Sequence, residues 1–215
     1  MLDAERVRGI LGEARPKRIF HLAAQSLPEL SWTNPAATFR VNVEGTLNLL
    51  EAVRLAKINP VIVAACSSSQ YALSRDGRPI KETDAMGPLS PYGVSKLAMD
   101  YCARLYAARY KQNILRVRPF FLIGPSKTGD VCSDLARRVV AVERGEAVDV
   151  PVGRLDIVRD FLDIRDGIEA MVLIAEKGEE NQDYNICAGY GCRIADVLDG
   201  DRKLARKPIL ERVDP

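Results

Sequence analysis

Three short apolar runs, separated by longer stretches with helical spacing, constrain the fold of this 215-residue chain more than any other feature. The runs cover residues 19–24, 61–65 and 114–117. Each has the length of a strand and is nearly continuous in apolar side chains, as is typical of strands buried on both faces of a parallel sheet. Because helices alternate with these strands, right-handed crossovers are expected. The sequence therefore predicts an α/β protein whose parallel sheet is covered by helices on both faces.

Capping residues and apolar spacing mark the helices between these strands. Asp3 is suited to cap a short helix that ends near Ala14. Asn34 and Pro35 are expected to open a long helix that continues to about Lys57. Residues 25–33 read as a polar loop. Another helix is predicted to begin after Pro91.

The second half of the chain has a different pattern. Ser133 is predicted to cap a helix that ends at Arg144, and a further helix spans residues 168–175, with another starting at Ile194. Shorter strands are predicted over residues 147–152, 158–164 and 184–187, with a turn over 188–191. Residues 200–215 are charged and weakly patterned.

Tyr92 and Lys96 lie one helical turn apart at the start of a predicted helix, so their side chains share a face. Free tyrosine titrates near pH 10, and a nearby ammonium stabilises its phenolate. The spacing alone is common, and a solvent-facing pair is the simple alternative. However, the segments that follow the three apolar strands are expected to meet at the carboxyl edge of the sheet, where ligands bind in such folds. This convergence favours a site.

Charge and hydropathy exclude several functional classes. The chain has 31 Lys and Arg against 29 Asp and Glu, a net charge of +2, so nothing favours binding to nucleic acid or to an anionic membrane. Its apolar runs are shorter than a membrane span, and its first residues lack the blocks of a signal peptide. We therefore expect a cytoplasmic protein.

Cysteine and histidine counts argue against a metal site. The five cysteines are scattered without a Cys-x-x-Cys pair, which fits reduced thiols. His21 is the single histidine, so zinc sites built from two or three histidines are excluded and a Ser-His-Asp hydrolase would have to use it. Because His21 lies inside an apolar run, we interpret it as a structural strand residue.

Motifs in a fixed order along most of the chain resemble the extended short-chain dehydrogenase/reductase family of NAD-dependent epimerases and dehydratases. They are His21-Leu22-Ala23-Ala24-Gln25, Asn42-Val43-Glu44-Gly45-Thr46, Ser67 with Tyr71, Pro91 to Lys96, Ile123-Gly124-Pro125, Arg159-Asp160-Phe161 and Tyr184-Asn185-Ile186. Residues 159–166 and 184–199 look most like GDP-4-dehydro-6-deoxymannose reductases and GDP-mannose 4,6-dehydratases.

The resemblance implies a domain organisation. Residues 1–123 would form a partial Rossmann-like domain that binds NAD or NADP, and residues 124–215 mainly an incomplete substrate-binding α/β portion. The family's first strands and its Gly-x-x-Gly-x-x-Gly turn do not precede Met1, and the chain stops before the family's usual C-terminal segment. Gly189-Tyr190-Gly191 mimics a phosphate loop, but Ile194 replaces the third small residue, so we interpret it as a turn.

The resemblance also implies residue roles. Tyr92 would be the proton donor or acceptor, and Lys96 would hold the nicotinamide ribose and lower the Tyr92 pKa. Ser67 would hydrogen-bond the reacting sugar oxygen, with Ser68 as the second choice. Other implied cofactor contacts are Leu22, Ala23, Ala24, Pro119 and Phe120, and other implied substrate contacts are Ser68, Ser69, Phe121 and Arg159.

Three of these positions carry particular weight for the substrate. Arg159 would pair with the substrate diphosphate, and a surface ion pair with a neighbouring aspartate is the alternative. Ser69 stands where family dehydratases carry an acid that helps to expel water, which favours reduction or epimerisation. Phe121 replaces an asparagine that contacts substrate in relatives, so one polar contact is absent.

Together the residues and the resemblance predict an NAD(P)-dependent nucleotide-sugar oxidoreductase that reduces a GDP-4-keto-6-deoxyhexose through Ser67, Tyr92 and Lys96. A GDP-mannose 4,6-dehydratase and a UDP-hexose 4-epimerase are the alternatives. A truncated, catalytically impaired remnant that keeps the fold is the non-enzyme alternative. If the family pattern holds, the helices over residues 35–57 and 92–110 would pair with those of a second copy in a homodimer.

Overall fold

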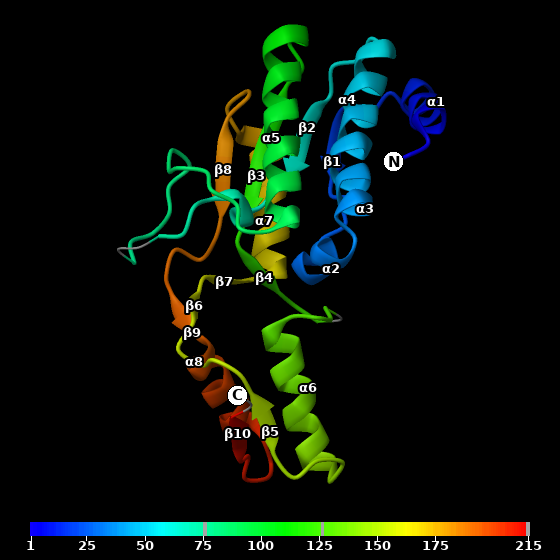
Figure 1. The fold of residues 1–215 in the computed structure, drawn as a ribbon. Helices are drawn as coiled ribbons and strands as arrows, with labels where there is room; N and C mark the ends of the chain where they lie inside the picture. The colour runs from blue at the N-terminus through cyan, green and yellow to red at the C-terminus, as the bar shows by residue number, and fades with distance from the viewer. Residues whose placement is uncertain (75–76, 126, 214–215) are drawn as a thin grey trace. The chain divides into compact units, whose positions relative to one another are not determined.

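The computed structural model describes residues 1–74, 77–125 and 127–213 and contains a four-stranded parallel sheet (Figure 1). The strands are β1 (Arg18–His21), β2 (Val61–Ala65), β3 (Ile114–Pro119) and β8 (Asp183–Ile186), in the order β1-β2-β3-β8. Ile62 pairs with Ile19 on one side and with Ile114 on the other, which sets the register. The predicted parallel sheet is confirmed, although β1 ends at His21 and leaves residues 22–24 in the following loop.

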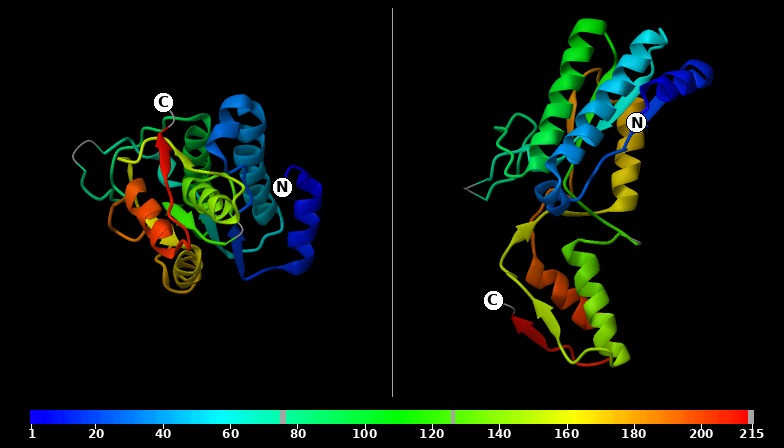
Figure 2. Two further views of the ribbon diagram at one scale, coloured as in Figure 1. Left: turned by 90° about the horizontal axis from the view of Figure 1, so that it is seen from below. Right: turned by 45° about the vertical axis from the view of Figure 1, so that its right-hand side comes forward.

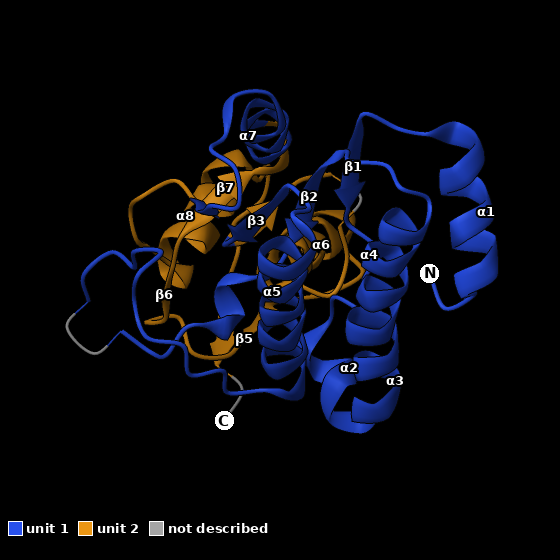
Figure 3. Cartoon of the chain, turned by 90° about the horizontal axis from the view of Figure 1, so that it is seen from above, with its two compact units in different colours: residues 1–120, 166–186 blue, residues 121–165, 187–215 orange. Residues whose placement is uncertain are grey.

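Helices cover both faces of this sheet, as predicted. Helices α4 (Gly45–Leu55) and α5 (Pro91–Tyr110) lie against one face, and α7 (Ile164–Lys177) lies against the other (Figures 2 and 3). Helix α1 (Ala4–Ala14) packs on α4. Apolar side chains such as Val53, Ile62 and Ile114 fill the space between helices and sheet and are fully buried.

The chain divides into two units, which Figure 3 distinguishes by colour. Unit 1 contains residues 1–120 and 166–186, and unit 2 contains residues 121–165 and 187–215. The predicted boundary fell after residue 123 and kept all later residues in the second part. In the structure, α7 and β8 instead bring the chain back to unit 1, because β8 extends the parallel sheet beside β3.

The long helix predicted from Pro35 to about Lys57 is confirmed, although one π-helical turn lies within it. A short helix α3 (Pro35–Phe39) is followed by a π-helical turn η1 (Arg40–Glu44) and only then by α4. Asn42 lies in the π turn and is fully buried. The predicted loop over residues 25–33 is partly wrong, because it contains helix α2 (Pro28–Thr33), which has proline at its first position.

Unit 2 has its own apolar core between helices α6 (Val131–Arg144) and α8 (Ile194–Leu204). Strand β5 (Val150–Val152) pairs in parallel with β10 (Glu211–Val213). Two further pairs are β4 (Phe121–Ile123) with β7 (Phe161–Asp163), and β6 (Val158–Arg159) with β9 (Cys192–Arg193). The core includes Leu135, Val139, Val150, Val152 and Leu198.

Several local predictions in unit 2 need correction. Asp130, not Ser133, caps α6, because its carboxylate accepts hydrogen bonds from two backbone N–H groups of the first turn. The single strand predicted over residues 158–164 is two strands, since Asp160 lies between β6 and β7. Strands β4, β9 and β10 were not predicted, and residues 214–215 of the weakly patterned tail lie outside the described residues.

Candidate active site

Helix α5 begins at the predicted Tyr92–Lys96 motif. Pro91 is its first residue, and the Ser90 hydroxyl accepts a hydrogen bond from the Gly93 backbone N–H at 3.0 Å. Tyr92 and Lys96 are 7% and 4% exposed. The alternative of a solvent-facing pair is therefore wrong, because both side chains are buried against the sheet.

Ser67 lies beside Tyr92. It follows β2 and caps the short 3-10 helix η2 (Ser68–Gln70), and its hydroxyl accepts a hydrogen bond from the Ser69 N–H at 3.1 Å. The side chain of Ser67 is close enough to the Tyr92 phenol that their interaction acts to lower the Tyr92 pKa. The Lys96 Nζ lies 6.0 Å from the centroid of the Tyr92 ring. The structure thus brings the three predicted catalytic residues together.

Burial controls the ionisation of this cluster. Desolvation raises the pKa of Tyr92 above its ordinary value, although the interaction with Ser67 opposes the shift. Desolvation also lowers the pKa of Lys96, whose ammonium donates to the Ala65 carbonyl oxygen at 2.7 Å. The predicted lowering of the Tyr92 pKa is therefore not what the structure gives. The phenol is therefore protonated near neutral pH.

Asn42 belongs to one of the family motifs in the sequence, and its side chain connects two segments of the candidate site. Its side-chain amide donates to the Gln25 carbonyl oxygen at 3.1 Å and to the Ser95 hydroxyl at 2.9 Å, and its oxygen accepts from the Gln25 N–H at 2.8 Å. Ser95 lies between Tyr92 and Lys96 on α5. The amide thus joins the loop after β1 to the helix that carries the candidate acid. A polar residue in an otherwise apolar helical stripe was the available signal.

His21 is structural, as predicted. It is 4% exposed at the end of β1, and its Nε2 lies 2.8 Å from the Thr46 hydroxyl oxygen. The Thr46 hydroxyl donates its proton to the Asn42 carbonyl oxygen, so the imidazole Nε2–H is the donor to Thr46. Desolvation, helped by the charges of Lys96 and the amino terminus, lowers the pKa of His21 to about 4. The imidazole is therefore neutral.

The predicted cofactor contacts lie at the carboxyl ends of β1 and β3, the two strands on either side of β2. Leu22 and Ala23 are exposed and Ala24 is half-buried in the loop after β1. Pro119 and Phe120 are half-buried at the end of β3. These residues fit one end of a dinucleotide, because exposed small and apolar side chains here share the sheet edge with Lys96, which keeps ammonium protons beyond the one given to Ala65. The 215 residues contain no Gly-x-x-Gly-x-x-Gly cradle for its pyrophosphate.

The predicted substrate contacts divide between the units. In unit 1, Ser68 is half-buried and Ser69 is exposed. In unit 2, the Phe121 ring packs edge-on against Phe161 with centroids 5.2 Å apart. Arg159 is exposed and donates to the Val158 carbonyl oxygen at 2.9 Å. Within the described residues Arg159 makes no ion pair, so the surface ion-pair alternative is not observed.

Asp160 shows why its neighbour has no carboxylate partner. Its two carboxylate oxygens accept hydrogen bonds from the backbone N–H groups of Ala188 and Gly189, each at 2.7 Å. Gly189 has a φ of +84°, a conformation that favours glycine. The Asp160 carboxylate thus stabilises the turn predicted over residues 188–191.

The described part of the chain shows neither a metal cluster nor a membrane-spanning helix. No group of three or more His, Cys, Asp or Glu side chains there could hold a metal ion. Likewise, none of the helices described is long and apolar enough to cross a membrane.

Comparison with known proteins decides the family. A family model described as GDP-mannose 4,6 dehydratase matches residues 1–212. The chain belongs to the GDP-mannose 4,6-dehydratase family. GDP-6-deoxy-D-mannose reductase from Pseudomonas aeruginosa is 31% identical to this chain over 194 residues, which cover 89% of this chain and 64% of the relative. Human GDP-mannose 4,6 dehydratase is 30% identical over 84% of this chain and 49% of its own length.

The chain is also similar to solved structures, which include an epimerase. The structure of RMD from Pseudomonas aeruginosa, complexed with NADPH, has a TM-score of 0.90 at 28% identity and covers 99% of this chain and 73% of that chain. UDP-glucose 4-epimerase from Thermus thermophilus, in complex with NAD, has a TM-score of 0.87 at 28% identity, covering 98% and 69%. The chain therefore spans less than two thirds of the curated relatives above and about 70% of these structures.

Proposed function

We propose that this family member is an NAD(P)-dependent nucleotide-sugar oxidoreductase that reduces a GDP-4-keto-6-deoxyhexose. The observation that carries the proposal is the placement of the buried Tyr92 phenol beside Ser67 and one helical turn from Lys96, whose Nζ lies 6.0 Å from the Tyr92 ring centroid. The similarity to a GDP-6-deoxy-D-mannose reductase and to a reductase structure with NADPH supports this choice of reaction and cofactor.

In the proposed reaction, the residues of this chain handle the proton. Ser67 donates a hydrogen bond to the sugar carbonyl oxygen and orients it toward Tyr92. The Tyr92 phenol gives its proton to that oxygen as the carbon accepts a hydride, and ketone becomes alcohol. A bound reduced nicotinamide supplies the hydride. Lys96 stabilises the phenolate that remains until a proton returns from solvent.

Reduction is favoured over dehydration by the residue two positions after Ser67. Ser69 is exposed there, and its backbone N–H donates to the Ser67 hydroxyl. A neutral hydroxyl is a poor general acid or base near pH 7 compared with a carboxylate. The chain thus carries the groups for proton transfer to a carbonyl, without an acid at the position used to expel water.

We assign the remaining predicted contacts to the two ligands. Leu22, Ala23, Ala24, Pro119 and Phe120 would line the nicotinamide end of NAD or NADP. Arg159 would pair with the substrate diphosphate, because its guanidinium is exposed and makes no ion pair with the described residues. Ser68, Ser69 and Phe121 would complete the substrate contacts.

The proposal is tested by following NADPH absorbance with GDP-4-keto-6-deoxymannose in the wild type and in Tyr92→Phe. Loss of the phenolic proton should lower kcat by about 100-fold or more. The matched control is Tyr101→Phe, which removes a hydroxyl from an exposed tyrosine of the same helix and should leave kcat unchanged. Equal cofactor consumption by the wild type and Tyr92→Phe would show that the proton donor is wrongly assigned.

Product analysis separates the alternative reactions. The protein is incubated in turn with GDP-mannose and with UDP-glucose, and the product sugar is identified. A 4-keto-6-deoxy sugar from the first would indicate a dehydratase, and UDP-galactose from the second an epimerase. NADPH titration by fluorescence is the accompanying measurement, and absence of binding at millimolar cofactor would favour the catalytically impaired alternative.

We also propose a cytoplasmic homodimer formed through α4 and α5. Leu55, Leu105 and Tyr110 on these helices are 46%, 67% and 45% exposed, and a partner packed on α4 and α5 would cover them. Cys66, Cys102, Cys132 and Cys192 are free thiols, as a reducing compartment requires. Leu105→Glu should convert the dimer to monomer in light scattering, and a monomeric wild type would contradict the assignment.

A further inference from the structure

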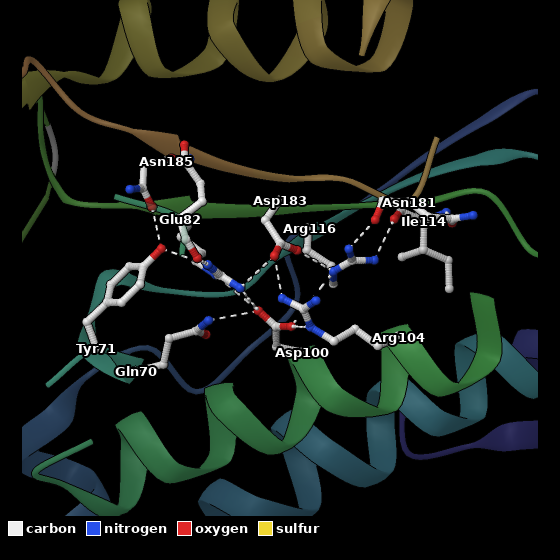
Figure 4. A network of polar contacts seen from close by, with 11 residues as sticks. Gln70, Tyr71, Glu82, Asp100, Arg104, Ile114, Arg116, Asn181, Asp183 and Asn185 are labelled. Atoms are coloured by element: carbon white, nitrogen blue, oxygen red, sulfur yellow. Dashed lines mark hydrogen bonds and ion pairs between the residues drawn. The ribbon is translucent and has the colours of Figure 1, made fainter. Parts of the chain in front are cut away.

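A buried group of charged side chains joins α5 to β3, β8 and the segment that follows Ser67 (Figure 4). We call it the arginine–aspartate network, and it consists of Asp100, Arg104, Arg116, Arg118 and Asp183. The side chains of Arg118 and Asp100 are 0% and 1% exposed. Buried ion pairs often add little to stability, because desolvation of both charges offsets their attraction. A network this deep therefore calls for a role besides stability.

The network starts on the same face of α5 as the proposed reaction groups. Tyr92, Lys96, Asp100 and Arg104 follow one another at intervals of four residues, so one stripe of the helix carries all four. Lys96 anchors the first part of this stripe to the Ala65 carbonyl oxygen at the end of β2. Asp100, one turn further, anchors the next part.

Asp100 and Arg118 form the centre of the network. The Arg118 Nη2 and Nε both donate to Asp100 Oδ2, at 3.0 and 3.1 Å, and Nη2 also lies 3.0 Å from Asp183 Oδ2. Burial acts to raise the pKa of Asp100, but hydrogen bonding from Gln70 and the charges of Arg118 and Arg104 outweigh it and lower the pKa. Asp100 is therefore ionised, and the pair has a fixed, charge-assisted geometry.

Gln70 and Tyr71, which follow Ser67 in the chain, both form hydrogen bonds with the Asp100–Arg118 pair. Gln70, the last residue of η2, donates through Nε2 to Asp100 Oδ2 at 2.8 Å. The Tyr71 hydroxyl accepts from Arg118 Nη1 at 2.7 Å and donates to Asn185 Oδ1 at 2.8 Å. Because Ser67 caps η2, the position of its hydroxyl depends on where these two residues are held.

We propose that Asp100 and Arg118 are positioning residues that hold Ser67 against Tyr92, acting through Gln70 and Tyr71. The inference rests on the proposed function, since it concerns the geometry of the same proton transfer. The pair lies between a rigid helix and a central strand, so it fixes the Ser67 segment relative to the helix that carries Tyr92. Small displacements of reacting groups lower the reaction rate by large factors. Holding Ser67 in place would therefore preserve the rate.

The test variant is Gln70→Leu, which removes the link and leaves the ion pair intact. Gln70 is fully buried, and leucine is similar in size. We expect kcat to fall about tenfold while KM for both substrates stays within about twofold, because orientation changes and binding does not. Tyr71→Phe removes the second link and should act in the same direction if Gln70→Leu fails to fold.

The matched control is Arg104→Gln. Arg104 bonds to Asp100 and Asp183 in the same network, but its side chain is 40% exposed and it makes no contact with Gln70 or Tyr71 among the described interactions. It should lower the melting temperature without changing kcat. If Gln70→Leu and Tyr71→Phe also lower only the melting temperature, the network is purely structural and the inference is overturned.

A second readout separates this inference from the proposed function. The pKa of Tyr92 is followed by NMR with ring-labelled tyrosine, and Tyr92→Phe assigns the resonance. Tyr92 is surrounded by Ser67 and Cys66 from the segment after β2 and by Lys96 on its own helix, and the interaction with Ser67 lowers its pKa. Gln70→Leu should therefore raise the Tyr92 pKa further, whereas Arg104→Gln should not.

The outcomes are distinct. If the wild type reduces no nucleotide sugar, the proposed function fails, but an upward pKa shift confined to Gln70→Leu and Tyr71→Phe still supports the positioning of Ser67. If turnover is found and neither kcat nor the Tyr92 pKa responds to these two variants, the proposed function stands and the positioning inference fails.

Discussion

Gly93 lies so close to Ser69 that a Cβ atom at position 93 would come within 2.5 Å of the Ser69 carbonyl oxygen. The same Cβ would lie 2.9 Å from the Pro88 Cβ. Backbone atoms cannot yield as a flexible side chain does, so the first turn of α5 and the η2 segment would have to separate. The absence of a side chain at residue 93 therefore allows Tyr92 and Ser67 to meet.

Gly93→Ala should move the first turn of α5 away from the segment that carries Ser67 and Ser69. We expect a loss of about 1–3 kcal/mol in the free energy of unfolding from the forced separation, and a fall in kcat of about tenfold or more. Urea titration and NADPH absorbance measure the two effects. The control is Gly9→Ala in α1, where a Cβ meets nothing within 4 Å and alanine should stabilise the helix by about 0.5–1 kcal/mol. Unchanged kcat in Gly93→Ala would contradict the close-approach argument.

The single histidine makes its titration easy to assign. His21 has a pKa of about 4 in the folded protein against an ordinary value of 6.5, so the unfolded chain binds a proton that the folded protein refuses. Its contribution is fully present above about pH 6.5 and is lost as the pH falls toward 4, up to about 3 kcal/mol. NMR of the imidazole Cε1 proton should show the low midpoint. A midpoint between pH 6 and 7 would show that the imidazole is solvated.

Arg118 and Arg104 share the acceptors Asp100 and Asp183, but their different burial should give their substitutions different effects on stability. Arg118→Gln removes a fully buried guanidinium from Asp100 and Asp183, and we expect the free energy of unfolding to fall by about 3–5 kcal/mol. Arg104→Gln removes a side chain that is 40% exposed, so water replaces much of its interaction and the loss should stay near 1 kcal/mol. Chemical denaturation of both variants measures the difference. Equal losses would show that exposure does not decide the energetics here.

Asp160 should control the turn after β8. Asp160→Ala removes the acceptor of the Ala188 and Gly189 N–H groups, each charge-assisted bond contributing about 1.5–3 kcal/mol in favourable cases. Hydrogen exchange of these two amides should become faster. Asp156→Ala is the control, because Asp156 is exposed and pairs with Arg154 instead. Unchanged exchange in Asp160→Ala would mean that other contacts hold the turn.

Local patterns predicted the layers of unit 1 well. Continuous apolar runs such as residues 61–65 cannot be placed at a wet surface, and helices with one apolar face between them leave a covered parallel sheet as the simple solution. The meeting of Ser67 with the Tyr92–Lys96 face followed from the same reasoning, since neighbouring parallel strands end at one edge. These features depend on short-range patterns and on topology rules.

Features that depend on long-range polar contacts escaped prediction. The π turn at Asn42 arises from bonds to Gln25 and Ser95, which no periodicity in residues 35–57 encodes. The network needs Asp183 beside Arg118, and that neighbour became visible only with β8 in place next to β3. Arg116 and Arg118 within an apolar strand were the missed signal, because buried guanidinium groups require carboxylates. The Tyr92 pKa was predicted in the wrong direction because spacing conveys proximity to Lys96 but not the extent of burial.

The return of the chain to unit 1 affects how the protein is made. Strand β8 is synthesised more than sixty residues after β3, yet it completes the sheet and supplies Asp183 to Arg116 and Arg118. Until β8 has left the ribosome, Arg116 and Arg118 lie on an edge strand and lack the carboxylate of Asp183. Unit 1 therefore cannot mature as a nascent N-terminal domain, and its folding must await the translation of most of unit 2.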